Sequence, residues 1–125
     1  MKESAKILIG DDSILARKQL KDVVARYIKN PVFIEATNGK EALEKYEQEQ
    51  PDLTFLDIVM PVRDGILATI EITKQYKDAR IVIVSSVGTK NQLRAAIEAG
   101  ALDFVQKPVR DDLMEQILEK YLGDD

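Results

Sequence analysis

The sequence contains neither cysteine nor histidine. Without cysteine the chain can form no disulfide bond and no thiolate metal site. Without histidine, it lacks the Ser-His and Cys-His pairs that activate a nucleophile, and it cannot bind zinc through imidazole. Carboxylates are therefore the expected chemical groups.

Long hydrophobic runs and basic blocks are also missing. Apolar runs such as Ile81–Val84 are far shorter than the ~20 residues needed to cross a bilayer. The first six residues precede only three apolar ones, too few for the core of a signal peptide. The 18 basic and 22 acidic residues are mixed along the chain and give a net charge of −4, so no basic patch indicates nucleic-acid binding. We expect a soluble, cytoplasmic protein that neither inserts into a membrane nor binds nucleic acid directly.

The composition indicates one globular domain over residues 1–125. Hydrophobic residues make up 45% of the chain and charged residues 32%, the balance of a folded protein. A chain of 125 residues fits one domain and can bury an adequate core without disulfides.

Five short apolar runs alternate with amphipathic segments. The runs predict strands at Ala5–Ile9, Val32–Ala36, Leu53–Leu56, Ile81–Val84 and Phe104–Val105. The intervening segments predict five helices. The first is a stripe from Ala16 to Ile28 closed by Asn30-Pro31, and the second is opened by the capping box Asn38–Glu41 and ends before Pro51. The third is preceded by Asp64-Gly65 and reaches about Tyr76, the fourth runs from Asn91 to Ala99 and is followed by Gly100, and the fifth has its inner face from Leu113 to Leu122.

This alternation predicts an α/β fold, (βα)₅, doubly wound around a parallel sheet. Right-handed crossovers place helices on both faces of such a sheet. For five strands the common order is 2-1-3-4-5, the flavodoxin-like and CheY-like arrangement, and ligands bind at the carboxyl edge where the strand order reverses.

Polar residues stand at the ends of four expected strands that would be neighbours in this order. They are Asp11 and Asp12, Asp57, Ser85 with Ser86, and Gln106 with Lys107. Clustered carboxylates repel one another unless a cation joins them, and hard oxygen ligands suit Mg²⁺. Lys107 would lie about two strands, roughly 10 Å, from Asp57, and its stem is long enough to return to that carboxylate.

Each residue also has an ordinary structural interpretation. Asp11-Asp12 resembles a helix N-cap, Ser85 a loop hydroxyl, Lys107 a solvated cation, and Phe104 a core aromatic. The four features meet at one edge of one sheet, however, and a buried, unpaired carboxylate at Asp57 would be unfavourable. The combination favours a functional site.

The sequence resembles the receiver domains of two-component response regulators. The resemblance spans essentially the whole chain and rests on four ordered segments: ILIGDDS at 7–13, DIVMPVRDG at 57–65, VSS at 84–86 and KP at 107–108. It implies a signalling switch phosphorylated by a sensor histidine kinase or a small phosphodonor, rather than an enzyme acting on a separate substrate.

The resemblance also implies a role for each site residue. Asp57 is the expected phosphoacceptor and a metal ligand; Asp12 binds Mg²⁺ directly, Asp11 acts through water, and the backbone carbonyl of Val59 completes the metal site. Mn²⁺ is an expected substitute for Mg²⁺.

The remaining implied roles concern the phosphoryl group and the switch. Lys107 contacts the phosphoryl oxygens, Ser85 is the switch hydroxyl, and the ring of Phe104 turns inward when Ser85 moves. The Lys107–Pro108 peptide is expected to be cis. The downstream protein is expected to bind the face formed by the fourth helix, fifth strand and fifth helix.

Two apolar residues flank the expected path of hydrolytic water, Val59 and Val87. Neither side chain can position a water molecule by hydrogen bonding, so we predict slow loss of the phosphoryl group.

Three other functions share parts of this pattern. Segments 85–88 and 96–104 look closer to chemotaxis receivers, which favours a stand-alone regulator, but a receiver belonging to a longer transcription factor remains an alternative.

An aspartyl phosphatase resembling haloacid dehalogenases would carry Asp-x-Asp after the first strand, whereas Asp11 and Asp12 are adjacent. A flavodoxin-like electron carrier would need a Ser/Thr/Gly-rich phosphate loop there.

Overall fold

The computed structural model describes residues 4–86 and 88–123. Its elements alternate in chain order: β1 (Ser4–Gly10), α1 (Ile14–Ala25), β2 (Asn30–Ala36), α2 (Gly39–Glu49), β3 (Leu53–Leu56), α3 (Gly65–Gln75), β4 (Ile81–Ser85), α4 (Lys90–Glu98), β5 (Asp103–Gln106) and α5 (Asp111–Leu122). All neighbouring strands pair in parallel, in the order β2-β1-β3-β4-β5. The predicted fold class and strand order are confirmed.

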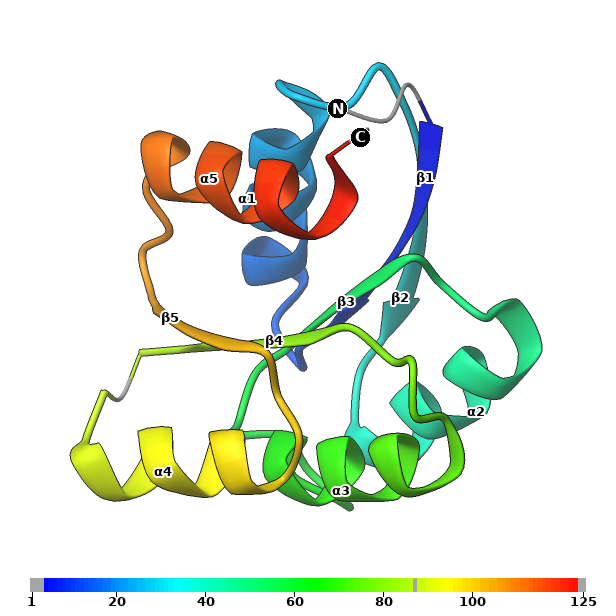
Figure 1. Ribbon diagram of the computed structural model, residues 1–125, viewed down its shortest axis with the longest axis vertical. Coiled ribbons are helices and arrows are strands. Elements are labelled where there is room, and N and C mark those ends of the chain that lie inside the picture. The colour runs from blue at the N-terminus through cyan, green and yellow to red at the C-terminus, as the bar shows by residue number, and fades with distance from the viewer. Residues whose placement is uncertain (1–3, 87, 124–125) are drawn as a thin grey trace.

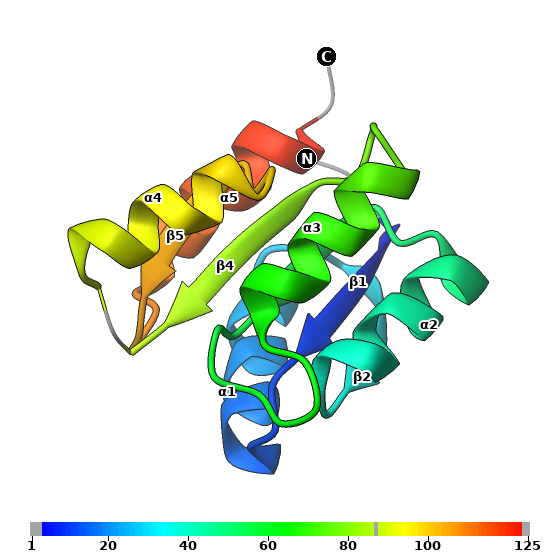
Figure 2. The same cartoon turned by 90° about the horizontal axis from the view of Figure 1, so that it is seen from below.

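The sheet lies between two layers of helices. Helices α1 and α5 cover one face, and α2, α3 and α4 cover the other (Figures 1 and 2). Successive strand residues point to opposite faces: in β1, Ile7 and Ile9 belong to the core beneath α1 and α5, whereas Leu8 belongs to the core on the other face. Within the described ranges, no helix combines the length and apolar character needed to cross a membrane.

The first helix is shorter than its apolar stripe predicts. It ends at Ala25, and the next two N–H groups, of Arg26 and Tyr27, bond to carbonyls three residues back, which tightens the final turn. Ile28 lies beyond the helix but is still 1% exposed. The stripe therefore predicted positions that are buried or partly buried, but it overestimated the length of the helix. Asn30-Pro31 opens β2 rather than closing the helix.

The predicted capping box lies at the start of α2. The side chain of Asn38 accepts a hydrogen bond from the Glu41 N–H at 2.8 Å, and the Glu41 carboxylate accepts one from the Thr37 N–H at 3.0 Å. After α4, Gly100 has a φ of +109°, the left-handed conformation that glycine adopts without strain at a helix end.

A hydroxyl connects helix α3 to the end of α4. Thr73 Oγ1 lies 2.8 Å from the carbonyl oxygen of Thr69, one turn back in its own helix, and also 2.8 Å from the carbonyl oxygen of Ala99. A Cβ at Gly100 would come within 2.9 Å of the Thr73 side chain. The two helices therefore meet closely at this point.

Candidate functional site

Three carboxylates converge at the carboxyl edge of the sheet. Gly10 of β1 pairs with Leu56 of β3, so the residues that follow them emerge side by side. One oxygen atom from each of Asp11, Asp12 and Asp57 lies within 4.8 Å of the other two. The strand order predicted this cluster, and the structure brings the three residues together.

Asp11 is held by contacts from several directions. Its N–H donates to the carbonyl of Ala36 at 3.0 Å, and its Oδ1 accepts from the N–H of Ser13 at 2.9 Å. The residue is 5% exposed, whereas Asp12 faces solvent. The side chain that caps α1 belongs to Ser13, which accepts from the N–H of Ala16. Interpreting Asp11-Asp12 as the helix cap is therefore wrong.

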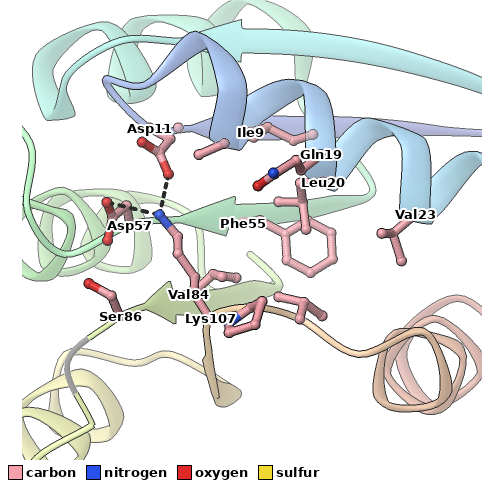
Figure 3. Close-up of a pocket in the computed structure, with 14 residues that line it drawn as sticks. Ile9, Asp11, Gln19, Leu20, Val23, Phe55, Asp57, Val84, Ser86 and Lys107 are labelled. Atoms are coloured by element: carbon pink, nitrogen blue, oxygen red, sulfur yellow. Dashed lines mark hydrogen bonds and ion pairs between the residues drawn. The ribbon is translucent and has the colours of Figure 1, made fainter.

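Lys107 crosses the sheet to reach two of the carboxylates. Its Nζ lies 2.6 Å from Asp11 Oδ2 and 3.3 Å from Asp57 Oδ2 (Figure 3). Its backbone N–H donates to the carbonyl of Ser85 at 2.8 Å, which extends the β4–β5 ladder by one residue. The Lys107–Pro108 peptide bond is cis, the isomer that the family resemblance implies. The side chain of Lys107 is thus a partner of the acidic cluster rather than a solvated cation.

The ammonium group compensates the buried carboxylate of Asp11 and the partly buried carboxylate of Asp57 unequally. Burial raises the pKa of Asp57, and this effect outweighs the opposing influence of Lys107; the charge of Asp11 adds to the rise. Burial would lower the pKa of Lys107, but the hydrogen bond to Asp11 and the charge of Asp57 raise it overall. Since the shorter contact goes to Asp11, Asp57 carries negative charge that a further cation would stabilise.

The backbone of Asp57 is enclosed on both sides. Its N–H donates to the carbonyl of Gly10 at 2.9 Å. On the other side Gly65, the first residue of α3, packs against its carbonyl: a Cβ at Gly65 would lie 2.0 Å from the Asp57 oxygen. The N–H of Gly65 also donates to the carbonyl of Ile58 at 2.9 Å. Only glycine permits this approach of helix α3 to the end of β3.

The other expected site residues that the structure describes lie on β4, on β5 and in the loop that follows β3. Ser85 ends β4 and is 1% exposed. Phe104 pairs with Ile83 in the β4–β5 ladder and packs, partly buried, against the core beneath α2, α3 and α4. Val59, two residues beyond Asp57, is 62% exposed. Val87 lies outside the described residues.

A cavity of about 390 Å³ adjoins the carboxylates and extends beneath α1 (Figure 3). Its polar end holds Asp11, Asp57, Lys107 and Ser86. Ser86 is the serine that lines this cavity; Ser85, the expected switch hydroxyl, is not among the lining residues. The remainder is mainly apolar, with Leu20, Val23, Phe55, Val84 and Val109 among the lining residues.

Two residues at this edge were given no role in the site by the sequence analysis, Gly65 and Arg17. Arg17 is 8% exposed and donates to the backbone carbonyl of Asp11 at 2.7 Å. Its position three residues before the buried Leu20 places it on the apolar face of α1, and a charged residue on such a face is a signal that the sequence does contain.

The strand order reverses between β1 and β3, where Asp11 and Asp57 emerge. Fold and site together define a doubly wound α/β protein with a carboxylate–lysine site at its topological switch point. The chain belongs to the response regulator receiver domain family, whose model matches residues 7–119.

Curated relatives include regulators of two lengths. The chain is 41% identical over 120 residues to the chemotaxis protein CheY of Bacillus subtilis, covering 94% of this chain and 98% of that protein. It is 34% identical to the probable C4-dicarboxylate response regulator DctR of the same organism, covering 93% of this chain and 51% of that protein.

A solved relative has nearly the same fold. It is a complex of CheX with CheY, BeF₃ and Mg²⁺ from Borrelia burgdorferi, in which the matched chain has a TM-score of 0.87 and 30% identity, covering 95% of this chain and 90% of that one. The protein is therefore a response regulator receiver of the CheY-like type, a signalling switch.

Proposed function

We propose that Asp57 accepts a phosphoryl group in a Mg²⁺-dependent reaction. Mg²⁺ would be held directly by the carboxylates of Asp12 and Asp57 and by the backbone carbonyl of Val59, and through bound water by Asp11, with Mn²⁺ as an alternative ion. The observation that carries the proposal is the convergence of three carboxylate oxygens within 4.8 Å beside the ammonium group of Lys107.

The residues present fit a divalent cation. Their donor atoms are hard oxygens, and solvent can reach the cluster through the exposed Asp12, so the ion can retain water ligands as Mg²⁺ usually does. Burial is the first cause that raises the pKa of Asp57, so added positive charge beside this carboxylate would stabilise its ionised form. Bound Mg²⁺ would supply charge neutralisation for the carboxylates and the phosphoryl oxygens.

Asp57 provides the nucleophile. A carboxylate oxygen attacks the phosphorus of a phosphohistidine on a sensor kinase, a phosphorus–oxygen bond forms, and the phosphorus–nitrogen bond breaks. The imidazole nitrogen keeps the electron pair and takes a proton from solvent. With acetyl phosphate as donor, acetate leaves instead. The product on Asp57 is a mixed anhydride, which water later hydrolyses.

Lys107 and Ser85 would respond to the new phosphate. The Lys107 ammonium, already 3.3 Å from an Asp57 oxygen, is placed to bind a phosphoryl oxygen, and the Ser85 hydroxyl would donate to another. The phosphate adds about −1.5 to −2 units of charge. Movement of Ser85 would let the partly buried ring of Phe104 turn inward and change the face of α4, β5 and α5.

Two exposed apolar residues of α4 support this face as a protein-binding surface. Leu93 and Ile97 lie one turn apart on α4 and are 44% and 49% exposed. We propose that a cytoplasmic effector protein binds there after phosphorylation. The 41% identity to CheY over nearly its whole length supports a chemotaxis role; the alternative is the receiver portion of a longer response regulator, and the length of the complete coding sequence distinguishes them.

The test is intact-mass analysis after incubation with acetyl phosphate and Mg²⁺. We expect one acid-labile phosphoryl group per chain, lost in Asp57→Asn and absent when the metal is chelated. Ser86→Ala is a matched control in the same pocket and should still be modified. A phosphoryl group that persists in Asp57→Asn would overturn the assignment.

A further inference from the structure

A buried arginine lies directly behind the acidic cluster. Arg17 of α1 is 8% exposed, and its guanidinium makes two charged or polar contacts. Nη1 donates to the backbone carbonyl of Asp11 at 2.7 Å, and Nε donates to Glu35 Oε1 on β2 at 2.9 Å. One side chain thus ties the β1–α1 loop to helix α1 and to strand β2.

The contact to Asp11 falls on the peptide that joins the two acids. The carbonyl of Asp11 belongs to the bond between Asp11 and Asp12, and a peptide unit is planar. A hydrogen bond that holds this oxygen therefore restricts the orientation of the Asp11–Asp12 peptide plane, which includes the backbone nitrogen of Asp12. Asp11 is also held through its N–H and side chain, but Asp12 faces solvent, so the orientation of its backbone depends strongly on this plane.

Arginine suits this task for a geometric reason. Its planar guanidinium donates hydrogen bonds in fixed directions, so the bond to Glu35 also orients the group toward the Asp11 carbonyl. The Glu35 carboxylate balances its charge, and the hydrogen bond from Arg17 is the main cause that lowers the pKa of Glu35. A buried cation is unfavourable unless paired and hydrogen-bonded, and both conditions are met here.

We infer that Arg17 is a positioning residue for the divalent-cation site, acting through the backbone carbonyl of Asp11 and anchored by Glu35. The inference rests on the proposed Mg²⁺ site. It gives Arg17 a role in metal affinity that does not depend on contact with the ion, the phosphoryl group or the phosphodonor.

Charge and geometry predict opposite effects on Mg²⁺ affinity when the guanidinium of Arg17 is removed. A positive charge behind a cation site opposes cation binding, so its loss through charge alone would tighten Mg²⁺ binding. Loss of an outer contact that orients a ligand typically weakens metal binding by roughly 10-fold or more. We therefore expect Arg17→Met to raise the Mg²⁺ dissociation constant about 10-fold.

The measurement is calorimetric titration of the full chain with Mg²⁺, alongside thermal unfolding in EDTA to record stability without metal. Lys21→Met is the matched control. Lys21 lies on the same helix and contacts the same Glu35 carboxylate at 3.1 Å, so the variant removes one positive charge but leaves the Asp11 contact intact. Its dissociation constant should stay within about two-fold of wild type.

A second variant guards against misfolding of Arg17→Met. Arg17→Met combined with Glu35→Leu removes both charges and leaves no unpaired carboxylate, and it should bind Mg²⁺ as weakly as the single variant. Phosphorylation by acetyl phosphate should need more Mg²⁺ for half-maximal rate in both, while the rate at saturating Mg²⁺ stays near wild type.

The outcomes separate this inference from the proposed function. Wild type that binds no Mg²⁺ overturns the metal site itself. Wild type that binds Mg²⁺, with Arg17→Met and the double variant binding equally or more tightly, overturns the positioning role alone. Equal weakening in Lys21→Met would also overturn it, because the effect would then follow charge and not the Asp11 contact.

Discussion

Replacing Gly65 with alanine should destabilise the protein, although the same change usually stabilises a helix. Gly65 is the first residue of α3, and alanine is favoured over glycine in helices by about 1 kcal/mol. Here the added Cβ would lie 2.0 Å from the carbonyl oxygen of Asp57 and 2.8 Å from its carbonyl carbon. These are backbone atoms, so no side-chain rotation can relieve the contact.

The magnitude follows from these two opposing effects. Overpacking of a rigid site costs about 1–3 kcal/mol, and contact with backbone atoms favours the upper end of that range. After subtracting about 1 kcal/mol for helix propensity, we expect Gly65→Ala to lower the free energy of unfolding by about 2 kcal/mol. For a domain of this size that lowers Tm by roughly 8 °C.

Urea denaturation followed by circular dichroism measures the change, and an unaltered m-value would show that the unfolded state is the same. Phosphorylation of Asp57 should also slow, since its carbonyl must move. Gly88→Ala is the matched control: its Cβ would meet the flexible end of Gln106 at 3.0 Å, so the cost should be below about 1 kcal/mol. Gly65→Ala at or above wild-type stability would refute the argument.

Three further changes test the electrostatics and the hydrolysis of the site. Asp57→Asn should raise metal-free stability by about 1 kcal/mol in urea with EDTA, because it removes a charge that burial disfavours; a less stable variant would contradict this. The Arg17 hydrogen bond lowers the pKa of Glu35 below its usual 4.5, so ionised Glu35 stabilises the fold above about pH 4.5 and this contribution disappears as pH falls through the folded-state pKa. The Tm difference between wild type and Glu35→Gln should therefore narrow on acidification, and a constant difference would exclude this linkage. Val59→Asn should speed loss of the phosphoryl group from Asp57, measured as decay of the modified mass, because an amide can orient water; an unchanged rate would disprove that role for the exposed Val59.

The sheet could be predicted because its signals are local. The apolar run Ile81–Val84 and the polar residues at strand ends each occupy a few consecutive positions, and the parallel order then places Asp11 beside Asp57. The extents of the elements were less predictable. Strand β2 begins at Asn30 because its ladder with β1 begins at Ser4, and a register between two strands cannot be read from either strand alone.

The support around the site was the part that sequence reasoning missed. Arg17 interrupts the apolar face of α1, yet its meaning depends on Glu35, eighteen residues later, and on the Asp11 carbonyl. Gly65 was named at a helix start and within the segment 57–65, but not for its packing. A side chain is excluded at this position because the Asp57 carbonyl lies against it, across the loop. Contacts of this kind are set by tertiary packing and leave no periodic pattern.

The hydroxyl of Thr73 has one proton but faces two carbonyl oxygens at the same 2.8 Å distance, that of Thr69 within α3 and that of Ala99 at the end of α4. It can satisfy only one of them at a time. If α4 were separated from α3, the proton could turn to the Thr69 carbonyl without any net loss of hydrogen bonding by the hydroxyl. Thr73 therefore adds little resistance to separation of the two helices, because its hydroxyl keeps one hydrogen bond in either arrangement.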